Sequence, residues 1–282
     1  METQSPARLA TLGHPQRLAI YGLLMRRYPD RVPAQEIAQA IAAKPSTASA
    51  YLAALARAGL ISAQREGPSL RYAVEMDAAQ ALFDDLFLDC CRGRVDLCIS
   101  DQNRRPAMAH ATDQDTDRKY RVLFLCTGNS ARSIFAESIL RHTAGDRFEA
   151  YSAGTTPKSE LNPFAVEVLE QKGHDTSVLR AKHMSEFQAD DAPRFDFVFT
   201  VCNQAANEDC PAWGGQPVSA HWGLTDPVKV EGTDAEKSLA FQHTYGALYR
   251  RIAAFTALPL PDLDRMSLQA AVDEIGQTQG EA

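Results

Sequence analysis

The sequence predicts two domains of different class: a mainly α N-terminal domain that carries a β-wing, and a C-terminal α/β domain built on a doubly wound parallel sheet. Helical periodicity dominates residues 1–98, whereas strand and helix patterns alternate from residue 120 onward. Between them, residues 99–119 are polar and aperiodic, as a linker is. A chain of 282 residues is long enough for two hydrophobic cores. We therefore expect domains at 1–98 and 120–260, this linker, and a helical tail at 261–282.

Composition and charge limit the functions to consider. No apolar run approaches the roughly 20 residues of a membrane span, and the first ten residues lack the hydrophobic core of a signal peptide. We therefore expect a cytoplasmic protein, whose six cysteines serve reactivity or metal binding rather than structural disulfides. Residues 1–98 hold 11 basic and 10 acidic residues, whereas the remainder holds 18 and 26. The acidic half is a poor candidate for binding nucleic acid.

The first domain shows the pattern of a winged helix-turn-helix, in which three helices precede a two-stranded wing. Prolines at or just before the helix starts suit a first helical turn, and Gly59 ends the third helix. Glu66-Gly67-Pro68 forms the turn of the wing, and an amphipathic helix closes the domain. The helices are expected at 15–28, 34–43, 46–58 and 77–91, and the strands at 60–64 and 70–74.

This plan assigns a candidate DNA-binding surface. The third helix of a winged helix-turn-helix enters the major groove of DNA, and the wing contacts phosphates. The side chains placed for these contacts are Ser46, Thr47, Ser49, Tyr51, Arg65 and Arg71. Because the basic footprint of this half is weak, a small helical dimerisation domain is the alternative.

Four stretches within residues 7–90 resemble the ArsR/SmtB family of repressors. They are Leu12-Gly-His-Pro-Gln-Arg-Leu18, Ser46-Thr-Ala-Ser-Ala-Tyr-Leu52, Leu55-Ala-Arg-Ala-Gly-Leu60 and Arg65-Glu-Gly-Pro-Ser-Leu-Arg-Tyr72. The resemblance implies a homodimer, joined through this domain, that binds a palindromic operator and releases it on binding a metal or metalloid.

The second domain contains the most informative stretch of the chain, Cys126-Thr-Gly-Asn-Ser-Ala-Arg132-Ser133. A cysteine and an arginine six positions apart, between a strand and a helix, are typical of a loop that wraps a tetrahedral oxyanion. The helix N-terminus is expected to lower the pKa of the Cys126 thiol, and the thiolate is the nucleophilic form. A chance cysteine and arginine in such a turn is the alternative. The expected oxyanion ligands are Thr127, Gly128, Asn129, Ser130, Ala131, Arg132 and Ser133.

The alternation of patterns around this loop predicts a parallel sheet with the loop at its carboxyl edge. The sequence assigns no role to the last helix. Strands are expected at 120–126, 148–153 and 195–201, and helices at 131–143, 162–172, 234–256 and 262–277.

Two further cysteines and an aspartate complete a candidate catalytic set. Cys202 follows an apolar strand, and Cys210 comes eight positions later, too far for a C-x-x-C motif and without histidines for a zinc site. A dithiol that closes into a disulfide fits this spacing better, and plain buried cysteines are the alternative. Asp226 stands before a proline in a loop, where a carboxylic acid could protonate a leaving oxygen.

Residues 120–257 resemble the arsenate reductases built on the low-molecular-weight protein tyrosine phosphatase fold. The matching motifs are Val122-Leu-Phe-Leu-Cys-Thr-Gly-Asn-Ser-Ala-Arg-Ser133, Ala136-Glu137, Ser152-Ala-Gly154, Thr200-Val-Cys202, Cys210-Pro211, His221-Trp-Gly and Asp226-Pro227. The resemblance implies that Cys126 attacks arsenate held by the loop and Arg132, while Asp226 protonates the departing hydroxide. Cys202 then attacks Cys126 and releases arsenite. Cys210 moves the disulfide to positions 202 and 210, where thioredoxin reduces it.

The same resemblance implies that Ser133 hydrogen-bonds the Cys126 thiolate and that Asn129 holds the shape of the loop. The chain departs from the family in two places. The spacing of the second cysteine pair is one residue longer than in the best-known members, and Ala131 stands where the phosphatases carry a second loop cysteine. Val228-Lys229 replaces the aromatic pair that flanks a phosphotyrosine ring, and a phosphatase needs no second cysteine pair. We therefore favour the reductase.

A second cluster, Cys90, Cys91 and Cys98, closes the first domain. Three thiolates bind As(III) through soft sulfur ligands, and incidental small apolar residues at a dimer interface are the alternative. The set resembles one class of arsenite-responsive ArsR repressors, although the gap after Cys91 is one residue longer than in the type example.

Together these features predict a bifunctional arsenic-resistance protein, an arsenite-responsive repressor fused to an arsenate reductase. No tightly bound cofactor is expected. Electrons are expected from thioredoxin, As(III) is the expected regulatory ligand, and operator DNA is the expected partner of the first domain. Two alternatives stay open: a phosphatase tethered to DNA, and a regulator that senses arsenate or redox state without turnover.

Overall fold

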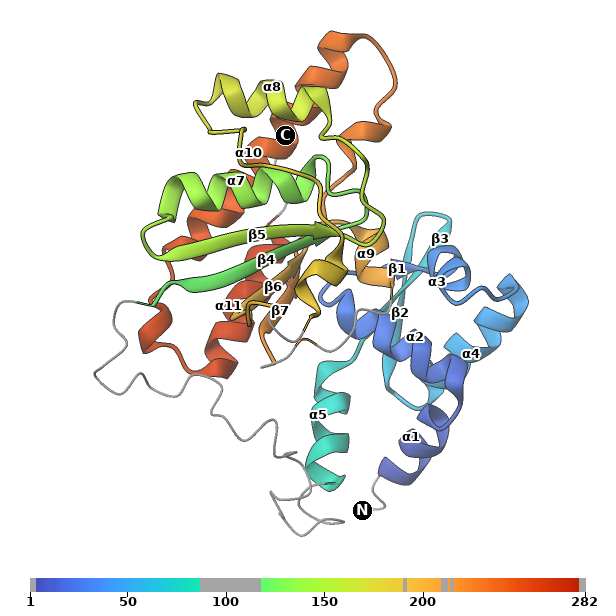
Figure 1. Cartoon of the computed structure of the whole chain (residues 1–282). Helices are drawn as coiled ribbons and strands as arrows, with labels where there is room; N and C mark the ends of the chain where they lie inside the picture. The colour runs from blue at the N-terminus through green and yellow to red at the C-terminus, as the bar shows by residue number, and fades with distance from the viewer. Residues whose placement is uncertain (1–3, 87–117, 190–191, 209–212, 214–215, 279–282) are drawn as a thin grey trace. The chain divides into compact units, whose positions relative to one another are not determined.

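The computed structural model divides into two compact units near residue 104 (Figure 1). It describes residues 4–86, 118–189, 192–208, 213 and 216–278. Most of the predicted linker, 99–119, therefore lies outside the described residues. Across the described part of the chain, every helix is too short or too polar to span a lipid bilayer.

Within residues 4–86, helices surround a three-stranded antiparallel sheet with the strand order β1-β3-β2. The two strands predicted in this half form the hairpin of β2 and β3, with Gly67 at positive φ in its turn. The sequence patterns missed α1 and the short β1, because one is a single short helix and the other has only two residues. The elements are α1 (Ser5–Leu12), α2 (Pro15–Arg26), β1 (Val32–Pro33), α3 (Ala34–Ala40), α4 (Pro45–Arg57), β2 (Ile61–Glu66), β3 (Ser69–Val74) and α5 (Met76–Asp84).

One hydrophobic core holds this unit together. Ile20 and Leu24 of α2 pack with Leu52 and Leu55 of α4, and all four are fully buried. α4 begins with a proline in its first turn, and Gly59 at φ +67° follows its end, as the helix boundaries predicted from sequence require. The predicted helix 77–91 is present as α5, and the last part of that range lies outside the described residues.

The C-terminal unit is built on a four-stranded parallel sheet with the strand order β5-β4-β6-β7, which confirms the parallel α/β class. The predicted strands and helices are present, and the sequence patterns missed β7 and the short α9. The elements are β4 (Tyr120–Cys126), α7 (Arg132–Ala144), β5 (Phe148–Gly154), α8 (Pro163–Gln171), η3 (Met184–Phe187), β6 (Phe197–Thr200), α9 (Asn203–Asn207), β7 (Val218–His221), η4 (Pro227–Lys229), α10 (Asp234–Thr256), η5 (Leu260–Asp262) and α11 (Arg265–Gln277).

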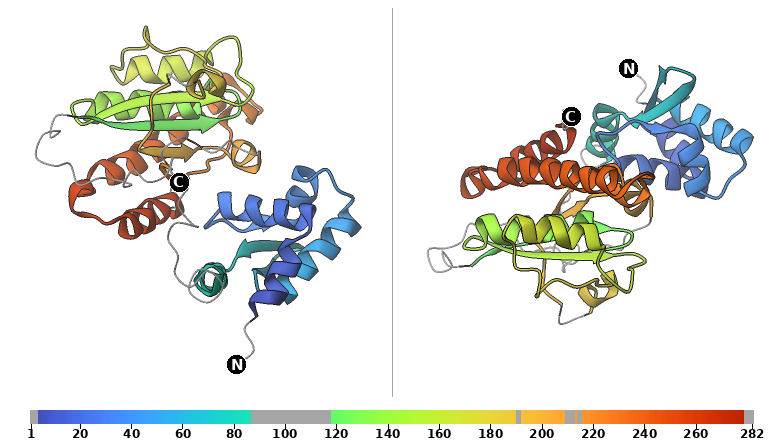
Figure 2. Two further views of the ribbon diagram at one scale, coloured as in Figure 1. Left: turned by 60° about the horizontal axis from the view of Figure 1, so that its bottom comes forward. Right: turned by 90° about the horizontal axis from the view of Figure 1, so that it is seen from above.

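Alternate residues of each strand face two separate apolar layers. Phe124 and Phe199 belong to the larger layer, which α7, α10 and α11 cover. Leu123 and Val198 face the opposite layer, which Phe195 and the segment around η3 cover. Figure 2 shows α10 and α11, in orange and red, together on one side of this sheet. The strand order reverses between β5 and β6, and the carboxyl edge of β4 lies at that reversal.

The C-terminal tail covers the edge strand of the sheet, a role that the sequence left open. α11 lies along β7, and the Trp222 indole donates a hydrogen bond to the Val272 carbonyl at 2.9 Å. Arg251 of α10 donates to the carbonyl oxygens of Trp222 and Gly276 at 2.8 and 3.1 Å. A side chain at Gly276 would place its Cβ 2.6 Å from the His221 carbonyl oxygen, so the helix approaches β7 closely only because this residue is glycine.

Candidate active site

The loop between β4 and α7 turns its carbonyl oxygens outward. The carbonyls of Cys126, Thr127, Gly128 and Ser130 accept hydrogen bonds from the N–H groups of Thr155, Thr156, Lys158 and Asn162, respectively. In a trans peptide unit the N–H points opposite to the C=O, so the N–H groups of residues 127–129 and 131 are directed into the loop. Several inward N–H groups ahead of a helix N-terminus form an anion-binding cradle.

Asn129, which the family resemblance assigns to holding the loop's shape, hydrogen-bonds to residues on both sides of the loop. It is fully buried with φ +41°, and its side-chain amide donates to the hydroxyls of Ser133 and Ser152 at 2.9 and 2.8 Å. Its amide oxygen accepts the N–H of Lys182 at 2.6 Å. A Cβ on the neighbouring Gly154 would lie 2.5 Å from a loop carbonyl oxygen, so the close approach of β5 to the loop requires glycine.

Cys126 lies at the bottom of the cradle, almost fully buried. Its Sγ is 2.8 Å from the Ser133 hydroxyl and accepts the Asn129 N–H at 3.1 Å. The expectation that the pKa of the Cys126 thiol is lowered is wrong. Burial raises the pKa of the Cys126 thiol and the nearby Cys202 raises it further, whereas Ser133, the Asn129 N–H and Arg132 lower it without offsetting the burial.

Arg132 is held by the loop that carries the candidate acid. Its guanidinium is 2.8 Å from the Asp226 carboxylate and donates to the Leu224 carbonyl oxygen at 3.0 Å. Only 11% of the Arg132 side chain is exposed, so the pair is screened weakly by solvent. Asp226 therefore neutralises much of the charge that would otherwise stabilise a thiolate at Cys126.

We expect Asp226→Asn to lower the pKa of Cys126 in the anion-free protein, because the uncompensated Arg132 charge then favours the thiolate. Alkylation of Cys126 by iodoacetamide at neutral pH should become roughly three to ten times faster. The rate is measured against pH by mass spectrometry of the Cys126 peptide, with the exposed Asp234→Asn as control. A slower or unchanged rate would contradict this electrostatic account.

A second thiol lies beside the loop. Cys202 follows the end of β6, is almost fully buried, and its Sγ is 3.4 Å from the hydroxyl of the loop residue Thr127. The N–H of Ala205 in α9 also points at this sulfur, at 3.4 Å. Both described cysteines are free thiols. The structure thus brings Cys126, Arg132, Asp226 and Cys202 together, from segments up to 100 positions apart in the sequence.

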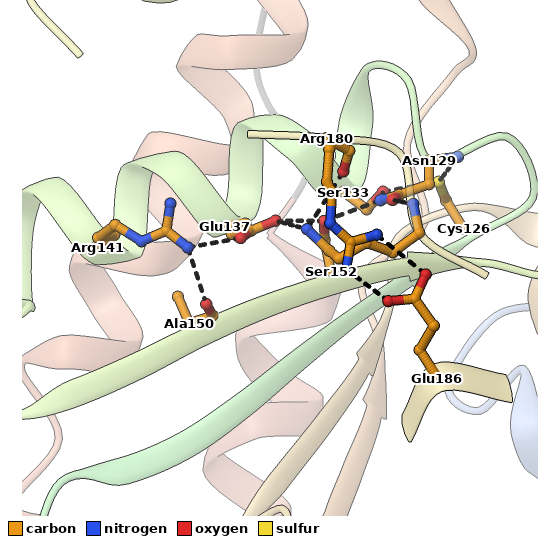
Figure 3. Close-up of polar contacts among 10 residues, drawn as sticks. Cys126, Asn129, Ser133, Glu137, Arg141, Ala150, Ser152, Arg180 and Glu186 are labelled. Atoms are coloured by element: carbon orange, nitrogen blue, oxygen red, sulfur yellow. Dashed lines mark hydrogen bonds and ion pairs between the residues drawn. The ribbon is translucent and has the colours of Figure 1, made fainter. Parts of the chain in front are cut away.

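A buried polar network continues from the loop into the interior (Figure 3). Glu137 of α7 accepts hydrogen bonds from the Ser152 hydroxyl at 2.5 Å and from the ammonium of Lys182 at 2.9 Å. The guanidinium of Arg141 contacts the same carboxylate at 2.6 Å. Glu137 lies one helical turn after Ser133 and belongs to the matching motif Ala136-Glu137, and these two sequence signals could have placed it near the loop. Nothing in the sequence pattern pointed to Lys182.

The remaining predicted site residues lie on the N-terminal unit or outside the described part of the chain. Ser46, Thr47 and Ser49 are exposed on α4, Tyr51 packs its ring against His14, and Arg65 is exposed on β2. Arg71 on β3 is 2.8 Å from the Glu66 carboxylate. Cys210 and the set Cys90, Cys91 and Cys98 lie outside the described residues. No cluster of three or more metal-ligating side chains occurs among the described ones.

Comparisons with known proteins match the C-terminal unit. Residues 121–260 match the family model "Low molecular weight phosphotyrosine protein phosphatase". An arsenate reductase of Shouchella clausii is 38% identical over 134 residues, which are 48% of this chain and 93% of the relative. An arsenate reductase of Bacillus subtilis is 35% identical over 134 residues, which again are 48% of this chain and 93% of the relative.

Among solved structures, a thioredoxin-dependent arsenate reductase of Corynebacterium glutamicum is 29% identical with a TM-score of 0.36. The match covers 52% of this chain and 68% of the solved one.

Proposed function

The chain belongs, through residues 121–260, to the low molecular weight phosphotyrosine protein phosphatase family and is an arsenate reductase within it, and from this premise we propose that Cys126, Cys202 and Cys210 pass two electrons from thioredoxin to arsenate. Arsenate is a tetrahedral oxyanion, the kind of ligand that the inward N–H groups of the loop and Arg132 suit. The loop itself supplies the positive potential that such an anion needs.

The observation that carries the proposal is the second buried thiol at the loop. A phosphatase requires a nucleophile, an anion-binding arginine and an acid, which Cys126, Arg132 and Asp226 already supply. Cys202 adds nothing to phosphate ester hydrolysis, yet it is buried against the loop through the Thr127 hydroxyl. A thiol in that place is suited to attack a neighbouring sulfur.

In the first step the Cys126 thiol gives up its proton, which the Asp226 carboxylate takes up, and the Cys126 thiolate attacks the arsenic atom. Asp226 then passes this proton to a hydroxide that leaves as water. Arsenic(V) is then bonded to Cys126 Sγ. The Cys202 thiolate attacks this sulfur, a disulfide forms, and the electron pair of the sulfur–arsenic bond passes to arsenic, which leaves as arsenite. Two thiols have been oxidised by two electrons, and arsenic has been reduced by two.

Cys210 has the last part in the relay. Its thiolate attacks Cys202 Sγ, which frees Cys126 and leaves a disulfide between positions 202 and 210. Because Cys126 and Cys202 are both buried, a disulfide between them is shielded from a protein reductant. A third thiol is what makes reduction by thioredoxin efficient.

Arsenate-dependent NADPH oxidation with thioredoxin and thioredoxin reductase tests the relay. We expect the wild type to turn over, whereas Cys210→Ser releases its first arsenite and then continues at least about tenfold more slowly, because thioredoxin must reach a buried disulfide. Cys98→Ser, in the other cysteine cluster, is the matched control. Steady turnover of Cys210→Ser at the wild-type rate would contradict the relay.

The same assay separates the alternatives. Supplying glutathione and glutaredoxin in place of thioredoxin distinguishes the two reductants. Hydrolysis of an aryl phosphate without arsenate-dependent NADPH oxidation would identify a phosphatase. Silence in both assays would identify a sensor.

We further propose that the N-terminal unit is a homodimeric winged-helix repressor. The exposed hydroxyls of Ser46, Thr47 and Ser49 line the first turns of α4, and Arg65 is exposed on the wing, which supports a DNA-facing surface. Arg71 would have to leave Glu66 to contact a phosphate. As(III) bound by Cys90, Cys91 and Cys98 would release the operator.

Fluorescence anisotropy with labelled DNA from upstream of the gene tests this second activity. DNA binding that is lost on adding arsenite would support the repressor. A protein that does not bind this DNA would indicate a dimerisation domain instead. The reductase would then make the ligand that relieves repression. A reducing cytoplasm, which we propose as the compartment, is required for all six thiols to act.

A further inference from the structure

His221, the last residue of β7, contacts both flanks of Cys202 with one ring. Its Nδ1 is 2.7 Å from the Thr200 hydroxyl, two positions before Cys202. Its Nε2 is 3.2 Å from the side-chain oxygen of Asn203, the position after Cys202. One imidazole therefore joins the end of β6 to the start of α9.

The chemistry of the partners assigns the proton on this ring. The Asn203 Oδ1 atom can only accept a hydrogen bond, so His221 Nε2 carries the hydrogen and donates it. Nδ1 then accepts the hydroxyl hydrogen of Thr200. A neutral imidazole with its hydrogen on Nε2 therefore satisfies both contacts at once, which an apolar side chain of similar size would not.

The space for this bridge depends on a glycine. A Cβ added to Gly223 would lie 2.4 Å from His221 Nε2 and 2.6 Å from Asn203 Oδ1, so any larger residue would push these two atoms apart. The His221 side chain lies in the interior, at a fixed position in the sheet. His221 is 2% exposed and pairs with Thr200 in the parallel register of β6 and β7.

These contacts fix the sulfur that the relay needs. Cys202 lies between the two bridged residues, and the Ala205 N–H that points at its Sγ belongs to the first turn of α9. If Asn203 moves, α9 and that N–H move with it, and so does the contact of Cys202 with Thr127. Small displacements between reacting atoms are costly, since a misplacement of about 1 Å can slow a step roughly a hundredfold.

We propose that His221 is a positioning residue for Cys202, which clamps β6 to α9 so that the sulfur stays in place to attack Cys126. The proposal rests on the proposed reductase function and adds a residue that acts only in its second step. The contacts described above join His221 to the flanks of Cys202, whereas the oxyanion loop is held by the hydrogen bonds of Asn129 with Ser133, Ser152 and Lys182. Its loss should therefore slow disulfide formation and leave oxyanion binding unchanged.

A single-turnover experiment on the full chain tests this. Reduced protein is mixed with arsenate, quenched with acid and a maleimide, and the free Cys202 thiol is quantified over time by mass spectrometry. The affinity for inorganic phosphate, measured by calorimetry, reports the loop separately. We expect His221→Leu to slow the loss of the Cys202 thiol at least about tenfold, with phosphate affinity within about twofold of the wild type.

Three further variants distinguish positioning from general damage. His221→Gln keeps one donor and one acceptor and should recover part of the rate. Asn203→Ala changes an exposed residue, removes the same hydrogen bond, and should slow the same step even if His221→Leu fails to fold. His243→Ala, an exposed histidine of α10, should behave as the wild type.

The outcomes separate this inference from the proposed function. A wild-type chain that keeps Cys202 reduced after arsenate would overturn the relay, and the inference with it. A wild type that forms the disulfide, together with Asn203→Ala and His221→Leu variants that form it equally fast, would overturn the inference alone. Equal losses of phosphate affinity and rate would also overturn it, because His221 would then support the whole site.

Discussion

Cys126→Ser is expected to abolish arsenate reduction, with a loss of at least about four orders of magnitude in turnover. The serine hydroxyl cannot form the sulfur–arsenic bond, and without that sulfur Cys202 has no electrophile to attack. The substitution replaces one buried sulfur atom by oxygen. The shape of the loop depends on Asn129 and Gly154, so the anion-binding cradle should persist. The measurement is arsenite produced per chain, with phosphate affinity as the check that the loop is intact.

The same variant separates the two halves of the chain. If they function independently, DNA bound by Cys126→Ser should still be released by added arsenite, at the concentration that releases it from the wild type. Added arsenate should no longer release it, because no arsenite is made. Loss of the response to arsenite itself would show that the active site and the DNA-binding unit are coupled.

Lys182→Met is expected to destabilise the C-terminal unit by about 3 kcal/mol, toward the lower end of the cost of breaking a buried ion pair. Lys182 and Glu137 have 8% and 3% of their side chains exposed, and removal of the ammonium leaves the carboxylate with fewer partners in a dry interior. Arg141 still contacts Glu137, which is why the larger costs are not expected. Urea unfolding followed by circular dichroism measures the loss.

Two further variants show whether the loss of stability comes from the buried ion pair. The double variant Glu137→Gln/Lys182→Met removes both charges and should recover part of the stability. Lys237→Met removes a partly exposed lysine whose nearest carboxylate is 3.9 Å away, and should change stability by less than about 0.5 kcal/mol. A Lys182→Met chain as stable as the wild type would mean that Arg141 alone neutralises Glu137.

The parts of the site that are contiguous in sequence could be predicted from it. Cys126, Asn129, Arg132 and Ser133 lie in one loop, so their spacing already specifies their chemistry. Cys202 could be singled out because it follows an apolar strand, and Asp226 because it precedes a proline in a loop; the family resemblance supplied their roles.

What could not be predicted depends on contacts between distant segments. Lys182 meets Glu137 across 45 positions, and a lysine in an irregular segment carries no periodic signal. The bridge made by His221 needs the register of β6 and β7, and each of these strands is only four residues long. The direction of the Cys126 pKa shift also depends on burial and on the engagement of Arg132, neither of which a motif reports.

Trp222 makes this arrangement optically observable. The chain has two tryptophans, and this one is fully buried, lies face to face with Phe199 at 4.0 Å between ring centroids, and directly follows His221. Its indole N–H donates a hydrogen bond to the Val272 carbonyl oxygen of α11, and Asp226 follows it by four positions in the sequence. A Trp213→Phe variant would leave a single tryptophan in the chain. The wavelength of the Trp222 fluorescence maximum would then report on the loop that carries Asp226 through each stage of the catalytic cycle, without an attached dye.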